Sequence, residues 1–230
     1  MNTSIQHFAR ALALGATLAL AAGQAQSAVV YVEDNSNPVA IPGLTGFVTT
    51  GALMSGMSVT ATFSGGTSQT LSWGTTGAAS GGVTGTGWGL SLDGDSFGGN
   101  WQFSMDSDLG QLVTLVLDGS TGFTVFDRTF GGSTGTAGSA LGMDFAFVSG
   151  FNGDATVTYS DPIGISPDAP VGDLFHMLTV DFGQGGPRTA FSFVQDSDND
   201  ARALPEPASL TLVGLGLVGL AAARRRTRQA

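Results

Sequence analysis

The residues best suited to chemistry in this chain are carboxylates set two positions apart. Asp196, Asp198 and Asp200 alternate with Ser197 and Asn199 in one acidic run. Oxygen ligands of this kind are those that calcium prefers, so the three aspartates are a candidate metal site. Calcium is the only cofactor that the sequence suggests. The glycine and the bidentate glutamate of a helix-flanked calcium loop are missing, so a hydrated acidic linker is the alternative interpretation.

The rest of the chain lacks the residues that common enzyme classes use. It has no cysteine, and all eight of its basic residues are arginine. Beyond the first 27 residues the single histidine, His176, alternates with apolar residues, so we expect it in a buried layer without a catalytic role. Two G-x-S-x-G matches, at 94–98 and 131–135, lack the helix that a nucleophile elbow requires. We expect no enzyme; a secreted hydrolase with two carboxylates in a cleft is the weakest alternative.

The charge of the chain excludes one class of partner. Between residues 28 and 203, seventeen Asp and Glu face only three Arg, which gives a formal charge of −14. Such a field repels phosphate backbones, so we expect no nucleic-acid partner. Since no disulfide can form, the fold must be stabilised by burial alone.

The first 27 residues have the form of a secretion signal. A polar start with His7 and Arg10 precedes an apolar run over 11–22 and a series of small residues up to position 28. This order directs export by the Sec machinery, with cleavage between Ala25 and Val29. Residues 1–27 are therefore predicted to be a signal peptide.

The last 27 residues combine a structure breaker, an apolar run and a cationic end. The breaker is Pro205-Glu206-Pro207, the apolar or small residues occupy 208–223, and the chain then continues with Arg224, Arg225 and Arg226. As a helix the apolar run spans ~24 Å, somewhat less than the ~30 Å hydrocarbon core. The positive-inside rule places the arginines in the cytoplasm and the acidic region outside. We expect a transmembrane helix over 208–223 that anchors the protein transiently in the inner membrane.

These three features together resemble the PEP-CTERM sorting signal of Gram-negative bacteria. In that family an exosortase, a membrane protease or transpeptidase, acts near the Pro-Glu-Pro motif and passes the protein to the cell surface or to extracellular polysaccharide. The resemblance covers residues 204–230 only. It implies an exosortase as partner and Pro205, Glu206 and Pro207 as the processing determinant.

Between the two ends the sequence predicts antiparallel strands. Short alternating runs are separated by Gly, Asp, Asn and Pro, and helical periodicity is absent. Trp88, Leu90 and Leu92, for example, fall on one face of a strand. The expected strands cover residues 29–33, 58–63, 70–73, 88–92, 101–105, 112–117, 123–126, 143–148, 155–159, 174–182 and 190–195.

These strands predict an all-β fold, an antiparallel two-sheet β-sandwich of the jelly-roll kind over residues 28–195. A closed barrel is the second choice. The Gly-, Ser- and Thr-rich stretches 74–87 and 131–139 are expected to be loops, and 196–203 an acidic linker to the tail.

The function expected from these features is structural or adhesive work at the cell surface or in an exopolysaccharide matrix such as a biofilm. The alternative is a lectin-like carbohydrate-binding module, with or without calcium. In that alternative Trp73, Trp88 or Trp101 would be an exposed platform on which sugar rings stack.

Overall fold

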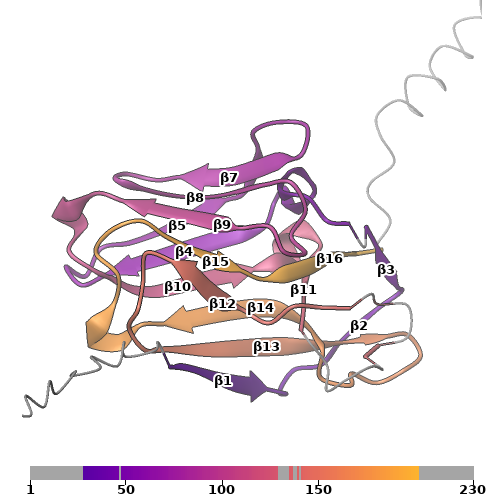
Figure 1. The fold of residues 1–230 in the computed structure, drawn as a ribbon. Helices are drawn as coiled ribbons and strands as arrows, with labels where there is room; N and C mark the ends of the chain where they lie inside the picture. The colour runs from indigo at the N-terminus through magenta and orange to yellow at the C-terminus, as the bar shows by residue number, and fades with distance from the viewer. Residues whose placement is uncertain (1–27, 47, 129–134, 137–138, 140, 202–230) are drawn as a thin grey trace, which may run out of the picture.

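The chain folds into two facing β-sheets (Figure 1). The computed structural model describes residues 28–46, 48–128, 135, 136, 139 and 141–201. Within these ranges the regular elements are sixteen strands and four short 3-10 turns, with no α-helix. The predicted all-β sandwich is confirmed, and neither sheet closes into a barrel.

The larger sheet contains ten strands. Its main path runs β3-β16-β11-β14-β10-β4-β5, and β13 pairs with β14 and carries β1 and β2 along its outer side. Its pairs are antiparallel except those of β1 and β2 with β13, which are parallel. The strands are β1 (Val29–Asp34), β2 (Val39–Ile41), β3 (Leu44–Thr45), β4 (Ser58–Phe63), β5 (Ser68–Ser72), β10 (Leu112–Asp118), β11 (Thr124–Asp127), β13 (Ala155–Ile165), β14 (Leu174–Asp181) and β16 (Asp196–Asp200).

The smaller sheet has six strands, all paired antiparallel in the order β12-β15-β9-β8-β7-β6. They are β6 (Gly74–Thr75), β7 (Ser80–Thr84), β8 (Trp88–Asp93), β9 (Trp101–Met105), β12 (Ala146–Ser149) and β15 (Phe191–Val194).

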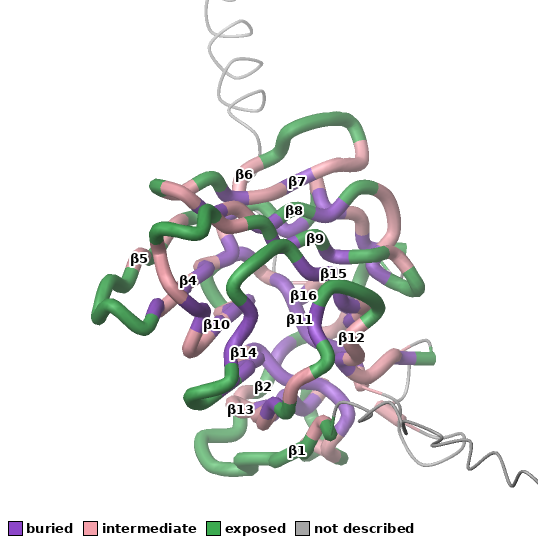
Figure 2. Tube along the Cα trace, turned by 60° about the vertical axis from the view of Figure 1, so that its left-hand side comes forward, coloured by how far each residue is buried: buried purple, intermediate pink, exposed green. Residues whose placement is uncertain are grey.

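An aromatic layer fills the space between the sheets. Trp101 stacks on Phe193 with ring centroids 5.6 Å apart, and Phe193 stacks on Phe145 at 4.8 Å. Rings in this arrangement combine a large apolar area with favourable quadrupole contacts. The edge strands β1 and β5 are mostly exposed, whereas β11 and β14 in the interior of the sheet are mostly buried (Figure 2).

All eleven expected strands are present, with shifted ends in most cases. Two of them, 58–63 and 101–105, coincide with β4 and β9. Their alternation of apolar and polar residues matches alternating burial, which is why the sequence pattern located them.

The stretch 74–87, expected to be a loop, contains β6 and β7. The glycines that suggested a loop are required in β7 because another backbone segment lies against it. A Cβ added to Gly81 would lie 2.0 Å from the carbonyl oxygen of Gly51, in the 3-10 turn η1 (Gly51–Met54). Glycine here permits close approach, not chain flexibility.

The expected acidic linker is wrong over its first five residues. Asp196–Asp200 forms β16, which pairs antiparallel with β11 on one side and with β3 on the other. The run was expected to be hydrated because of its charge. Its backbone instead completes a sheet, and most of its carboxylates have partners inside the protein.

Several predictions fall outside the described residues. These are the signal peptide 1–27, the helix 208–223, the motif Pro205-Glu206-Pro207 and the arginines at 224–226. In the ranges that are described, no helix is long and apolar enough to cross a membrane.

The aromatic layer predicts a large penalty for removing one ring. Phe193 is completely buried, so we expect Phe193→Ala to lower the free energy of unfolding by about 3–5 kcal/mol in urea denaturation. Phe97 is 45% exposed, and Phe97→Ala is the matched control with a loss below about 0.5 kcal/mol. Similar losses in the two variants would contradict this placement of the core.

Candidate functional site: buried carboxylates beside the chain exit

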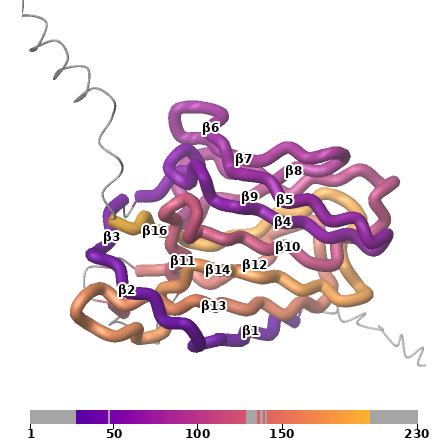
Figure 3. The backbone as a smooth tube through the Cα atoms, turned by 180° about the vertical axis from the view of Figure 1, so that it is seen from behind, coloured from indigo at the N-terminus to yellow at the C-terminus, as the bar shows by residue number. Residues whose placement is uncertain are grey.

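Five aspartates lie buried where the last strand enters the larger sheet. Figure 3 shows this strand, β16, at one end of the sandwich, close to β3 and β11. We call them the carboxylate cluster: Asp127 at the end of β11, Asp173 just before β14, and Asp196, Asp198 and Asp200 on β16. None of the five is more than 4% exposed. Asp127 and Asp196 lie directly opposite each other in the β11–β16 ladder, on the same face of the sheet.

Hydroxyl groups of the segment between β11 and β12 bind two members of the cluster. Ser139 Oγ donates to Asp127 Oδ2 at 2.6 Å, and Thr136 Oγ1 donates to Asp173 Oδ1 at 2.7 Å. Both serine and threonine are neutral donors, so they satisfy carboxyl oxygens without neutralising a charge.

A third member, Asp196, is bound by the serine of one G-x-S-x-G match. Ser96 Oγ donates to Asp196 Oδ1 at 3.0 Å, and the Ser197 amide donates to the same oxygen at 2.8 Å. Ser96 is completely buried and its Oγ also accepts from the Ser197 amide at 3.1 Å. This hydroxyl therefore joins a loop to β16, a structural contact that explains the serine without a nucleophilic role.

Asp198 and Asp200 occupy different environments. Asp198 Oδ2 has no hydrogen-bond partner among the described residues, although the side chain is only 1% exposed. Asp200 Oδ2 lies 3.9 Å from Nε2 of His176, which is 2% exposed. The expected burial of His176 is confirmed.

Burial shifts the protonation of the cluster. Loss of solvation raises the pKa of Asp127 to about 8; the hydrogen bond from Ser139 opposes the shift, and the neighbouring carboxylates Asp198, Asp196 and Asp173 add to it. Loss of solvation also raises the pKa of Asp198 to about 7 and that of Asp196 to about 6. Asp127, Asp196 and Asp198 thus hold protons at pH values where exposed aspartates are ionised.

Strand geometry argues against calcium at Asp196, Asp198 and Asp200. Alternate residues of a strand are about 6.6 Å apart, whereas calcium ligands all lie within about 2.6 Å of one ion. In the described part of the chain, no group of three or more His, Cys, Asp or Glu side chains could hold a metal ion. The placement of these three side chains does not support the calcium hypothesis.

The expectation that a tryptophan is an exposed stacking platform is wrong. Trp73, Trp88 and Trp101 are at most 3% exposed and belong to the core. The indole nitrogens of Trp73 and Trp101 donate to the carbonyl oxygens of Gly51 and Gln195, at 2.7 and 3.0 Å. The alternating pattern that placed Trp88 and Trp101 in strands also placed them on the inner face.

A hollow of about 530 Å³ opens where β16 ends. Its lining includes the partly buried ring of Phe123, the amide of Asn199 and the half-exposed side chain of Leu53. Asn199 Nδ2 donates to the Leu53 carbonyl at 3.2 Å, which joins two walls. The hollow combines four segments, near residues 45, 53, 122 and 200, so no local sequence pattern could reveal it.

Comparison with known families identifies the segment that follows this hollow. The family model of the PEP-CTERM protein-sorting motif matches residues 203–226. The tail is a PEP-CTERM sorting signal. Neither the curated proteins nor the solved structures gave a match to the chain.

The PEP-CTERM signal makes this an exported protein of the cell surface or the extracellular space, with an exosortase as its processing partner. The match begins two residues after Ala201, whose amide donates to the Gly43 carbonyl at 2.8 Å. The PEP-CTERM signal is thus joined almost directly to the final strand of the sandwich, with no intervening domain.

The carboxylate cluster predicts a protein that is more stable in mild acid than in mild base. Asp127, Asp196 and Asp198 have folded-state pKa values above the unfolded value of about 3.9, so the folded state binds more protons between those values. The free energy of unfolding therefore falls as pH rises from about 4 through about 8. We expect a loss on the order of 4–8 kcal/mol between pH 5 and pH 8 in urea denaturation of the processed protein.

Two variants and one addition test the origin of this slope. Asp127→Asn should flatten the curve above pH 6, whereas Asp106→Asn, at an exposed position, should leave it unchanged. Stability that rises toward pH 8, or an unaltered slope in D127N, would contradict the prediction. Repeating the series with calcium tests the metal hypothesis, because recovery at pH 8 would mean that the ionised carboxylates bind the ion.

Proposed function

We propose that this protein is a non-enzymatic structural or adhesive component of the cell surface or of an exopolysaccharide matrix. The observation that carries the proposal is the junction between the sandwich and its tail. The last strand is buried in the larger sheet, and Pro205 follows Ala201 by four residues. A chain of that length spans at most about 14 Å. Sorting therefore delivers the whole sandwich, which stays close to the membrane until the tail is cut.

The interior of the sandwich supports a role without catalysis. Ser96 and His176, the two side chains most suited to nucleophilic or acid–base work, are buried among structural contacts. Of the five buried aspartates, Asp200 lines the hollow at the end of β16, and the other four lie at the sheet junction outside that hollow. What the domain offers to the outside is an acidic surface rich in hydroxyl groups.

Processing of the tail should depend on its Pro-Glu-Pro motif. Replacing Pro205, Glu206 and Pro207 by alanine should leave full-length protein in the inner membrane, because the exosortase loses its recognition element. The measurement is the size and membrane fraction of the protein on immunoblots. Alanines at Thr227, Arg228 and Gln229 form a matched control that should be processed. Normal processing of the motif variant would refute the sorting claim.

Binding of neutral carbohydrate at the hollow is a second candidate function. The hollow places the Phe123 ring beside the amide of Asn199 and the hydroxyls of Thr45 and Ser55, groups that suit a sugar ring and its hydroxyls. The formal charge of −14 between residues 28 and 203 favours neutral over anionic polymers. This candidate site takes the place of the exposed tryptophans that the sequence suggested for carbohydrate binding, and it needs no calcium.

Loss of the Phe123 ring should weaken binding without unfolding the domain. Phe123 has a left-handed backbone with φ of 53°, so Phe123→Asn removes the ring while keeping a residue that tolerates this conformation. A glycan array should identify a ligand, and its affinity should fall about 3- to 10-fold in the variant. The control Phe97→Ala, on another loop, should bind normally. An array without hits, or equal affinities, would remove this candidate.

A further inference from the structure

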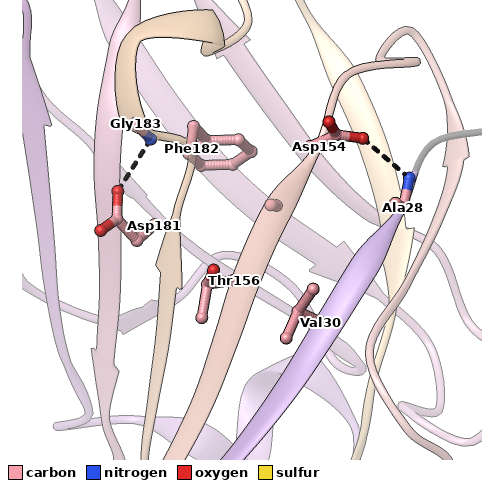
Figure 4. A pocket seen from close by; sticks show the side chains of 8 residues that line it. Ala28, Val30, Asp154, Thr156, Asp181, Phe182 and Gly183 are labelled. Carbon is pink, nitrogen blue, oxygen red and sulfur yellow. Dashed lines mark hydrogen bonds between the residues drawn. The ribbon is translucent and has the colours of Figure 1, made fainter.

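The chain is held at Ala28 by both of its backbone polar groups, and Figure 4 shows the bond from its nitrogen to Asp154. The Ala28 nitrogen donates to Asp154 Oδ1 at 3.1 Å, and the Ala28 carbonyl accepts from the Ala155 amide at 3.2 Å. Strand β1 starts at the next residue, with Val29 opposite Ala155. Asp154 and Ala155 therefore hold the residue that directly precedes β1.

Within the predicted cleavage window, between Ala25 and Val29, the sequence allows two positions for signal cleavage. Signal peptidase requires small residues one and three positions before the cut. Gly23 and Ala25 satisfy this rule for a cut after Ala25, and Ala25 and Ser27 satisfy it for a cut after Ser27. The first cut leaves a neutral amide at Ala28, whereas the second makes the Ala28 nitrogen the amino terminus.

We propose that signal peptidase cuts between Ser27 and Ala28, and that the α-ammonium group released there forms an ion pair with the Asp154 carboxylate. In the cut, water hydrolyses the Ser27–Ala28 peptide bond. Its hydroxyl completes the Ser27 carboxyl group, and its proton goes to the Ala28 nitrogen, which binds one more proton from solvent. The inference rests on the predicted signal peptide and is independent of the function proposed above.

The surroundings of Ala28 favour a positive charge. Asp154 and Asp181 both line a hollow of about 310 Å³ next to Ala28, and no arginine lines it (Figure 4). Asp181 accepts a hydrogen bond from the Gly183 amide at 2.8 Å, so Asp154 is the carboxylate that contacts the Ala28 nitrogen. Hydrogen bonds between charged partners are about twice as strong as neutral ones.

The position of β1 gives the ion pair a structural role, which is to hold one end of an exposed edge strand. Among the described residues this strand pairs with β13 alone, at an edge of the larger sheet, and its Val30 and Val32 are 56% and 42% exposed. An edge strand with few buried side chains depends on its backbone bonds and its ends to stay in place. Ala28 and Asp154 are both exposed, so the ion pair lies at the surface, where solvent weakens it.

The absence of lysine makes the test specific. After a cut before Ala28, the α-amino group is the only primary amine of the mature chain. The full-length protein is exported from a bacterial host, and the mature form is analysed by N-terminal sequencing and intact mass. We expect a chain that starts at Ala28; a start at Gln26 or Val29 would overturn the assigned cut.

The ion pair is tested on the same mature protein. Reductive ¹³C-methylation labels the single amine, and its NMR titration gives the pKa. We expect Asp154→Asn to lower this pKa by about 0.2–0.7 unit, as for an exposed ion pair. Asp181→Asn, on the same hollow, is the control and should change the pKa less. Equal values in the wild type and D154N would overturn the ion pair even if cleavage occurs at Ala28.

Discussion

The structure depends on the burial of one crossing, at Gln195, where the chain passes from the smaller sheet to the larger one. β15 ends at Val194 and β16 begins at Asp196, so Gln195 lies between the sheets and is completely buried. Its Oε1 accepts from the Tyr159 hydroxyl at 2.5 Å, and its Nε2 donates to the carbonyls of Asp127 and Asp196 at 3.2 and 2.8 Å. A buried amide is tolerated only when its bonds are satisfied, and here each bond joins elements of the sandwich.

This crossing explains why an acidic segment lies inside the protein. Once Gln195 is fixed, the next five residues must run along β11, and their carboxylates become buried, with Ser96 and the Ser197 amide bound to Asp196. Ser139 and Thr136 bind Asp127 and Asp173 of the same cluster, and His176 lies beside Asp200. Burial raises the pKa values of Asp127, Asp196 and Asp198. The same strand, β16, also leads to the PEP-CTERM tail. Two aspartates with raised pKa values, Asp196 and Asp198, and the attachment point of the tail therefore belong to one element.

Local sequence patterns predicted most of the strands. They failed where packing between distant segments gives a glycine-rich or acidic stretch a structural role that its composition does not suggest. Alternation located β4, β8 and β9 because one face of each strand is buried and the other is exposed. Glycine in β7 suggested a loop, yet it permits close approach to η1. The acidic composition of Asp196–Asp200 suggested a linker and a calcium site. The sequence does not show which charged segments have polar partners within the fold. The hollow near Phe123 was beyond sequence reasoning, since its walls come from four distant segments.

The sequence by itself determined the all-β class, the acidic character and the PEP-CTERM signal, because these are set by local periodicity, composition and the order of short segments. Only the tertiary structure decided that the tryptophans and the carboxylate cluster are buried and that Ala28 contacts Asp154. Each of these depends on residues far apart in the chain, such as Ser96 and Asp196, that meet only when the two sheets pack.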